Sequence, residues 1–395
     1  MNVKFSTKFV AASAAAVMAL SFAGCSGGSM DDSSSSSAKA SGDSITIGTV
    51  TTNSGTAAAY GEAEVKGFEL AVSEINAKGG INGKKVKLES MDDKGDATEA
   101  SNAYNKLAGD NNVLAVAGPT ISATTAAVAP LADQSKLVTI APAATSDSIE
   151  TGNYLFRTCF KDSYQGEVAA RFAAENLKVK KVAVLYGTGD PYSSGVGEAF
   201  AKAAEKLGLE VVDKESSSSA DDTEYSAQLQ KIQASGAELL YAPYYYSVAG
   251  PYIIPQARSV GFEGYVMGPD GYDGLKLTGD KSQYNKTYYT THYSADDNTN
   301  TKVQDFIKSY KSKNNAEPNT FAALGYDTIY MIMQAIEKAG ENATREDVRN
   351  AVAGMTFDGV TGKFTMDKSG SPTKSVTVLE MKDGKPVYNT TVQPK

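Results

Sequence analysis

Residues 113–125 read VLAVAGPTISATT, and this stretch decides the fold class. The apolar run Val113–Ala117 leads directly into Gly118–Thr125, where four of the eight residues carry hydroxyl groups. An alanine-rich helical pattern follows, so the stretch joins a buried strand to a helix. The first turn of a helix offers unpaired N–H groups and a partial positive charge. Short hydroxyl donors at this junction therefore predict a binding site for a small anion.

The same alternation of strand and helix extends in both directions. The first series predicts strands at 45–50, 85–91, 113–117 and 137–140, and helices at 62–77, 97–107 and 122–134. The second series predicts helices at 164–177, 195–207, 225–234 and 248–259, and strands at 181–186, 210–212, 238–241 and 265–267. Two further helices, 301–313 and 321–339, fit either series. This pattern is typical of parallel sheets flanked by helices, and we predict an α/β protein with two lobes.

Composition excludes several functions. The chain has 395 residues, 41% of them hydrophobic, and a formal net charge of −8, which disfavours a nucleic-acid partner. Its single histidine, His292, rules out a histidine-based triad and a multi-histidine zinc site. The acidic stretch 92–99 lacks the spacing of a calcium loop and fits a turn in which Asp96 caps a helix. We therefore expect no enzyme, no cofactor and no metal.

The N-terminus has the pattern of an export signal. Lys4 and Lys8 precede an apolar stretch, 10–23, that is too short to span a bilayer. Small residues then lead to Cys25, as in the cleavage site of a bacterial lipoprotein. We predict that 1–24 is a signal peptide and that Cys25 carries a lipid anchor, so the protein is extracytoplasmic, at the cell surface or in the periplasm. An ordinary secretory cleavage site, or a buried structural cysteine, is the alternative.

Residues 25–43 are rich in Ser, Gly and Asp and have too few apolar side chains to fold, so they predict a flexible tether. Removing the signal peptide also removes two lysines, which brings the formal charge to −8 − 2 = −10. The other cysteine, Cys159, lies in an apolar run and is interpreted as a small core residue rather than a reactive thiol.

Six segments of the chain resemble, in order, the type I periplasmic binding proteins of the branched-chain amino acid (Leu/Ile/Val) family. They are the N-terminal signature at 60–100, AGPTISATTAAVAP at 117–130, TIAPAAT at 139–145, VLYGTGDPYSSG at 184–195, QARSVGFEGYVMGPDG at 256–271 and FDGVTGKFTMDKSGSP at 357–372. The resemblance spans about 45–387, nearly the whole chain after the tether.

This resemblance implies two lobes joined by a hinge of three segments. We place the crossings near Asp162, Tyr293 and Lys374. Lobe 1 would then comprise 44–162 and 294–373, and lobe 2 would comprise 163–293 and 374–395. The late helices would return to lobe 1, and the last strand to lobe 2.

The resemblance also implies how an amino acid would be bound. Ser122, the backbone of Ala143, and Thr145 occupy the positions that meet the α-carboxylate in the family, while Asp270 stands where the family has a glutamate for the ammonium group. Ser122 could instead serve only as a helix cap. Asp270 could be a turn residue, because Pro-Asp-Gly favours turns.

Tyrosines would wall the pocket. Tyr60 and Tyr192 match positions that the family uses over the ligand and at the cleft of the second lobe. In the stretch YAPYYY, Tyr244 is the best match, and Tyr245 is its alternative. Tyr272, close to Asp270, is a further candidate. These aromatic residues favour a hydrophobic or aromatic amino acid as the ligand.

We therefore predict a monomeric substrate-binding lipoprotein that captures an amino acid by hinge closure and delivers it to an ABC permease. A sensory protein of the same fold, acting through another protein, is one alternative. A binder of amides or urea is a second alternative. An enzyme finds no nucleophile, metal cluster or acid–base pair in the sequence to support it.

Overall fold

The computed structural model describes residues 44–149, 151–296 and 300–394. The predicted signal peptide, the tether and Cys25 lie outside these residues. Within them, no helix combines the length and the apolar character needed to cross a bilayer.

The first lobe is built on a sheet of five parallel strands in the order β2-β1-β3-β4-β5. The strands are β1 (Ser44–Thr51), β2 (Lys85–Asp92), β3 (Val113–Ala117), β4 (Val138–Ala141) and β5 (Leu155–Arg157). The connecting helices are α1 (Ala58–Ala77), α2 (Ala97–Gly109) and α3 (Ser122–Ser135). Strand β3 is buried along its whole length, as its position inside a helix-covered parallel sheet requires.

The turn after β3 depends on Gly118. This residue has a φ of +120°, and a Cβ atom there would lie 1.9 Å from the carbonyl oxygen of Val50 on the neighbouring strand. Only glycine fits such a close approach at a positive φ. The chain can therefore turn sharply at the carboxyl end of the sheet and start α3 four residues later, at Ser122.

The second lobe has a sheet of seven strands in the order β14-β13-β10-β9-β8-β6-β7. Its strands are β6 (Lys181–Gly187), β7 (Glu210–Ser217), β8 (Leu239–Tyr241), β9 (Tyr265–Gly268), β10 (Thr287–Thr291), β13 (Val376–Lys382) and β14 (Lys385–Val392). Strands β6 to β10 are parallel, and the hairpin of β13 and β14 adds antiparallel strands beside β10.

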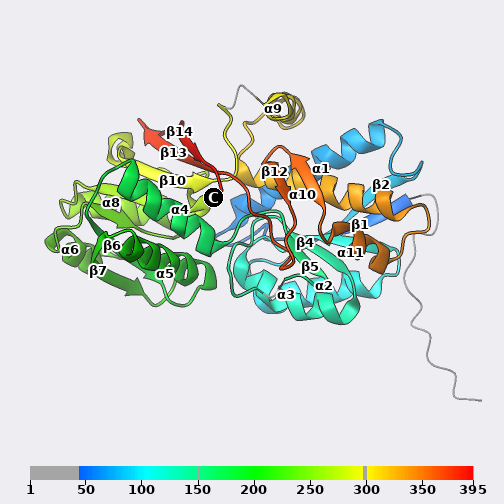
Figure 1. Cartoon of the computed structure of the whole chain (residues 1–395), viewed down its shortest axis with the longest axis horizontal. Coiled ribbons are helices and arrows are strands. Elements are labelled where there is room, and N and C mark those ends of the chain that lie inside the picture. The colour runs from blue at the N-terminus through cyan, green and yellow to red at the C-terminus, as the bar shows by residue number, and fades with distance from the viewer. Residues whose placement is uncertain (1–43, 150, 297–299, 395) are drawn as a thin grey trace, which may run out of the picture. The chain divides into compact units, whose positions relative to one another are not determined.

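The helices of the second lobe are mostly short. They are α4 (Asp162–Glu175), α5 (Pro191–Lys206), α6 (Ser226–Ala234), α7 (Tyr246–Val248), the π-helix η1 (Ala249–Ile253), α8 (Ile254–Ser259) and the 3₁₀ turns η2 (Asp270–Tyr272) and η3 (Lys281–Tyr284). Helices α4 and α5 pack side by side, as the green ribbons in Figure 1 show.

The chain crosses between the two sheets three times. It leaves the first sheet after β5, leaves the second after β10, and returns to the second after a small hairpin. The segment between the last two crossings contains α9 (Thr301–Asn314), α10 (Thr320–Ala339), α11 (Arg345–Val352), β11 (Thr356–Gly359) and β12 (Gly362–Thr365). Helix α10 packs along α1, so this late segment belongs with the first lobe (Figure 1).

Most predicted elements are present, but several boundaries differ. The helix predicted at 62–77 begins at Ala58, and the helix predicted at 195–207 begins at Pro191, behind an Asp190 cap. The helix predicted at 248–259 is wrong as one element, because it is divided into α7, η1 and α8. Asp96 caps α2 as predicted, accepting hydrogen bonds from the backbone N–H groups of the residues two and three positions later.

Candidate functional site

One cavity brings together residues from the predicted site and from both lobes. It is lined by Tyr60, Thr120, Ile121, Ser122, Ala143, Tyr192, Tyr245, Asp270, Gly271 and Phe321. Its volume is only about 10 Å³. That space is close to what one water molecule needs. A larger ligand can therefore enter only if the walls move apart.

The wall from lobe 1 is made where two strands end. Ser122 opens α3, and its Oγ accepts a hydrogen bond of 3.1 Å from the backbone N–H of Ser146, in the loop after β4. Ala143 lies in the same loop. The alternative that Ser122 is the helix cap is wrong, because the N-cap position belongs to Ile121 and no side chain caps this helix. The hydroxyl proton of Ser122 and the N–H groups of the first turn of α3 can serve as donors toward an anion.

Thr120 also lines the cavity, but its hydroxyl is committed elsewhere. It donates to Glu64 Oε2 at 2.6 Å and accepts from the backbone N–H of Thr52 at 3.1 Å. Thr145, predicted beside the ligand, does not line the cavity. It is fully buried behind the wall, where its carbonyl accepts a 2.9 Å hydrogen bond from the N–H of Asp162 at the start of α4.

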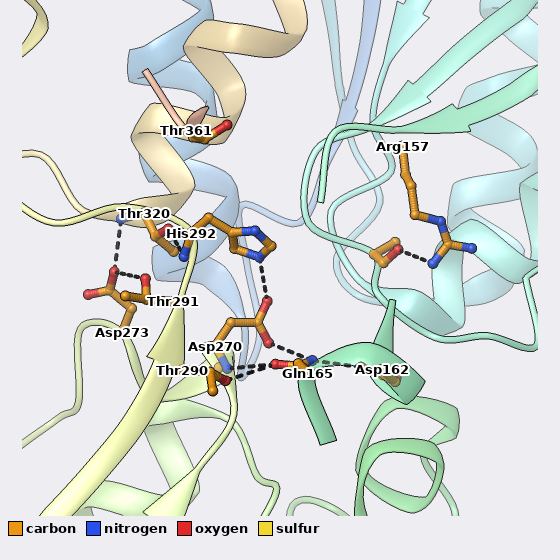
Figure 2. A network of polar contacts seen from close by, with 12 residues as sticks. Arg157, Asp162, Gln165, Asp270, Asp273, Thr290, Thr291, His292, Thr320 and Thr361 are labelled. Atoms are coloured by element: carbon orange, nitrogen blue, oxygen red, sulfur yellow. Dashed lines mark hydrogen bonds and ion pairs between the residues drawn. The ribbon is translucent and has the colours of Figure 1, made fainter. Parts of the chain in front are cut away.

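The wall from lobe 2 centres on Asp270, which is 2% exposed. Its Oδ1 accepts hydrogen bonds from the Tyr192 hydroxyl at 2.8 Å and from Gln165 Nε2 at 3.3 Å. Its Oδ2 lies 3.2 Å from Nε2 of His292. Figure 2 shows the carboxylate between Gln165 and His292, at the start of the turn η2. A buried carboxylate held by several donors is a favourable partner for a cation.

The hydrogen bonds around Asp270 continue to residues that do not line the cavity. Gln165 Nε2 also donates to Asp162 Oδ1 at 2.8 Å, and its Oε1 accepts from Thr290 at 3.1 Å (Figure 2). Burial, together with the charge of Asp270, raises the pKa of Asp162 well above its usual range.

Aromatic rings form the remaining walls. Tyr60 stacks on Phe321, with ring centroids 3.9 Å apart, and Tyr192 stacks on Tyr245 at 5.3 Å. Tyr60 and Tyr245 meet edge to face at 5.8 Å. Burial, and then the charge of Asp270, raise the pKa of Tyr192 well above its usual range, so its phenol group remains a donor to the carboxylate. These rings favour an apolar ligand side chain.

The choice between the two neighbouring tyrosines is corrected. Tyr245 lines the cavity, whereas Tyr244 is fully buried in the core of lobe 2, where its hydroxyl lies 2.8 Å from Ser217 Oγ. Strand β8 ends at Tyr241 and α7 begins at Tyr246, and Tyr245, at the N-cap of α7, places its ring centroid 5.8 Å from that of Tyr60 in lobe 1. Tyr272 also points away, since its hydroxyl donates to the carbonyl of Ala242 at 2.7 Å within the same core.

The structure thus gathers Ser122, Ala143, Tyr60, Tyr192 and Asp270 around one cavity. Sequence reasoning missed Phe321, Gln165 and His292. Phe321 belongs to an apolar helix pattern, and nothing in that pattern singles it out. Cys159 is buried, and burial raises the pKa of its thiol to about 12, which confirms the interpretation of a core residue.

Known proteins resemble this chain over most of its length. Residues 44–386 match the model of a family described as periplasmic binding protein. The Leu/Ile/Val-binding protein homolog 3 of Brucella melitensis is 30% identical over 348 residues, covering 86% of this chain and 92% of that protein. The leucine-, isoleucine-, valine-, threonine-, and alanine-binding protein of Pseudomonas aeruginosa is 30% identical over 333 residues, covering 83% and 87%.

A solved structure shows the same architecture. The branched-chain amino acid transporter substrate binding protein LivJ from Streptococcus pneumoniae, in complex with isoleucine, superposes with a TM-score of 0.82. It is 32% identical to this chain, and the match covers 89% of this chain and all of that one.

Proposed function

This chain belongs to the periplasmic binding protein family, and from that premise we propose that it captures a free amino acid for an ABC importer. The ligand would carry a branched-chain, other hydrophobic or aromatic side chain. One observation carries the proposal: the donor-rich junction at Ser122 and the buried carboxylate of Asp270 line the same cavity from opposite lobes. A zwitterion needs this pairing of a donor for its acid end and an acceptor for its ammonium group.

We assign the carboxylate of the ligand to Ser122, to the backbone around Ala143 and to the first turn of α3. Thr145, which is buried and does not line the cavity, would help to hold the loop after β4 in place. The ammonium group would meet Asp270, and Tyr60, Tyr192, Tyr245 and Phe321 would enclose the side chain. The identity of the side chain would depend on these apolar contacts, each methylene contributing about 1–3 kcal/mol to selectivity.

Binding would proceed by closure of the lobes on their three connecting segments. Contacts between the lobes support this mechanism: the backbone N–H of Tyr246 donates to Tyr60 Oη at 3.0 Å, and the N–H of Thr320 donates to Asp273 Oδ2 at 2.9 Å. A ligand too large for the present cavity can enter only when these bonds break. A ligand that bridges both lobes would shift the population toward the closed arrangement.

A thermal-shift screen tests the function. The twenty amino acids, urea and short amides would each be added to the purified protein without its signal peptide. A ligand at 100 times its Kd stabilises the folded protein by about 2.7 kcal/mol, which is a clear shift in Tm. We expect shifts for hydrophobic or aromatic amino acids. A shift in Tm with urea or amides alone would show that the ligand belongs to that class and is not an amino acid.

We also propose that Cys25 anchors the protein to the outer face of the cell membrane, where the permease can receive the ligand. Membrane fractionation of Cys25→Ser in the native cell tests the anchor. The variant is expected in the soluble or secreted fraction. A variant that still sediments with lipid would exclude lipidation as the means of attachment.

A further inference from the structure

His292 lies just behind the cavity and takes no part in the contacts proposed for the ligand. It follows β10, where the chain leaves lobe 2, and its side chain is fully buried. Its ring stacks on Phe160, with centroids 3.6 Å apart, on the segment that enters lobe 2. Its backbone N–H donates to Thr320 Oγ1 at 3.3 Å, at the start of α10. Figure 2 shows Asp270 below the imidazole, so the ring joins the hinge to the binding wall.

The chemistry of the pair fixes the direction of the hydrogen bond. An ionised carboxylate only accepts, so Nε2 of His292 must carry the proton that it shares with Asp270 Oδ2. Nδ1 is buried and has no hydrogen-bond partner among the residues that the structure describes, which suits a bare nitrogen better than an N–H group. Burial is the main cause that lowers the pKa of His292 to about 4, and the charge of Lys374 also lowers it. The imidazole is therefore a neutral donor at neutral pH.

A count of acceptor sites shows what this bond achieves. A carboxylate offers about four lone-pair directions. Tyr192, Gln165 and His292 occupy three of those of Asp270. One direction is left for a further donor, and Asp270 is among the residues that line the cavity. If His292 were removed, Oδ2 would lose this donor and the carboxylate could rotate away from that orientation.

We infer that His292 is a positioning residue: it holds the Asp270 carboxylate so that the remaining lone pair meets one N–H of the ligand ammonium group. His292 thereby sets the preference for ligands that carry a primary amine over otherwise identical ligands that lack it. This inference rests on the proposed function. It assigns selectivity to a residue that does not line the cavity.

Two substitutions separate positioning from packing. In His292→Phe, an aromatic ring can still stack on Phe160, but the donor is lost. In His292→Gln, the side-chain amide can place an N–H near the position of Nε2. Calorimetry would measure the Kd of leucine, or of the best amino acid from the screen, and of the same molecule without its amine, 4-methylpentanoate for leucine. Circular dichroism would verify that each variant folds.

We expect His292→Phe to weaken leucine binding at least fivefold while changing 4-methylpentanoate binding less than twofold, and His292→Gln to recover most of the loss. An unchanged preference for the amine in His292→Phe, or an equal loss for both ligands with no recovery in His292→Gln, would overturn the inference alone. A wild-type protein that binds no amino acid would overturn the proposed function, and the inference with it.

A measurement on the wild-type protein tests the hydrogen bond from His292 to Asp270 independently. Because His292 is the only histidine, ¹⁵N-histidine labelling yields the signals of one imidazole. We expect the Nε2–H tautomer at pH 7, with a larger shift on adding leucine than on adding 4-methylpentanoate. The Nδ1–H tautomer, or equal shifts for the two ligands, would contradict a donor bond to Asp270.

Discussion

The two walls of the cavity are built in different ways. Lobe 1 presents the rings of Tyr60 and Phe321 and, where strands end, the small residues Ser122 and Ala143, so its polar donors are largely backbone groups fixed by the fold. Lobe 2 presents Tyr192, Tyr245 and Asp270, whose long side chains are held by hydrogen bonds and ring contacts. Backbone donors change only if the fold changes, whereas polar side chains change with single substitutions. We therefore expect the polar contacts of lobe 2 to be more sensitive to mutation than those of lobe 1.

Substitutions of Tyr244 and Tyr245 compare the effect of losing a core ring with the effect of losing a cavity ring in lobe 2. Tyr244→Ala is expected to lower the free energy of unfolding by about 3–5 kcal/mol, because it removes a fully buried ring from the core. Tyr245→Ala should cost less stability and weaken ligand binding about tenfold, because it removes a ring from the cavity wall. Urea unfolding and calorimetry measure the two effects. Weaker binding in Tyr244→Ala alone would reverse the assignment.

The pH dependence of stability tests the buried side of the lobe 2 network. The pKa of His292 is lowered from 6.5 to about 4 in the folded protein, mainly by burial. The unfolded chain therefore takes up a proton first as the pH falls, so the folded state loses stability below about pH 6.5. Between pH 7.5 and 4.5, the wild type should lose about 2–3 kcal/mol more than His292→Gln.

The groups that face His292, Asp270 and Lys374, are present in both proteins, so the difference between the two isolates the imidazole. Buried carboxyl groups with raised pKa values, such as Asp162, act in the opposite direction in both proteins and cancel in the comparison. Equal losses of stability for the two proteins would mean that the histidine takes up its proton as readily in the folded state as in the unfolded one.

The contrast between the walls also explains what the sequence could predict. Ser122 and Ala143 lie where an apolar strand runs into a helix, a pattern readable within a dozen residues. Asp270 follows a strand in the same way. The family resemblance, confirmed by the match over 44–386, supplied the roles proposed for them.

The other parts of the site could not be predicted from short stretches of sequence. Tyr244 and Tyr245 are neighbours in an irregular stretch after β8, where the alternation of a strand no longer tells which side chain faces which way. Gln165 meets Asp270 only because α4 packs against β10, and His292 meets it only because the hinge segments converge. Such contacts depend on tertiary packing, which a single histidine or glutamine in the sequence does not indicate.

The charge of the lobe 2 wall is tested by Asp270→Asn, which keeps the size of the side chain. A hydrogen bond to a charged group contributes about 1.5–3 kcal/mol, so amino acid affinity should fall about 10- to 100-fold, and Asp270→Ala should also lose at least a factor of ten. Calorimetry with 4-methylpentanoate is the control, because a ligand without an amine should not lose affinity. Unchanged affinity for the amino acid would remove Asp270 from the site.

The smallest effect is expected in the lobe 1 wall. Ser122→Ala removes one hydroxyl but leaves the N–H groups of the first turn of α3 in place, so it should cost about 1 kcal/mol, or roughly fivefold in affinity. Ser135→Ala, at the other end of the same helix, is the matched control and should leave affinity unchanged. Calorimetry would measure the ligand affinity of both variants. A loss in Ser122→Ala as large as that in Asp270→Asn would show that the hydroxyl, and not the backbone, holds the acid end, and that both walls depend on side chains.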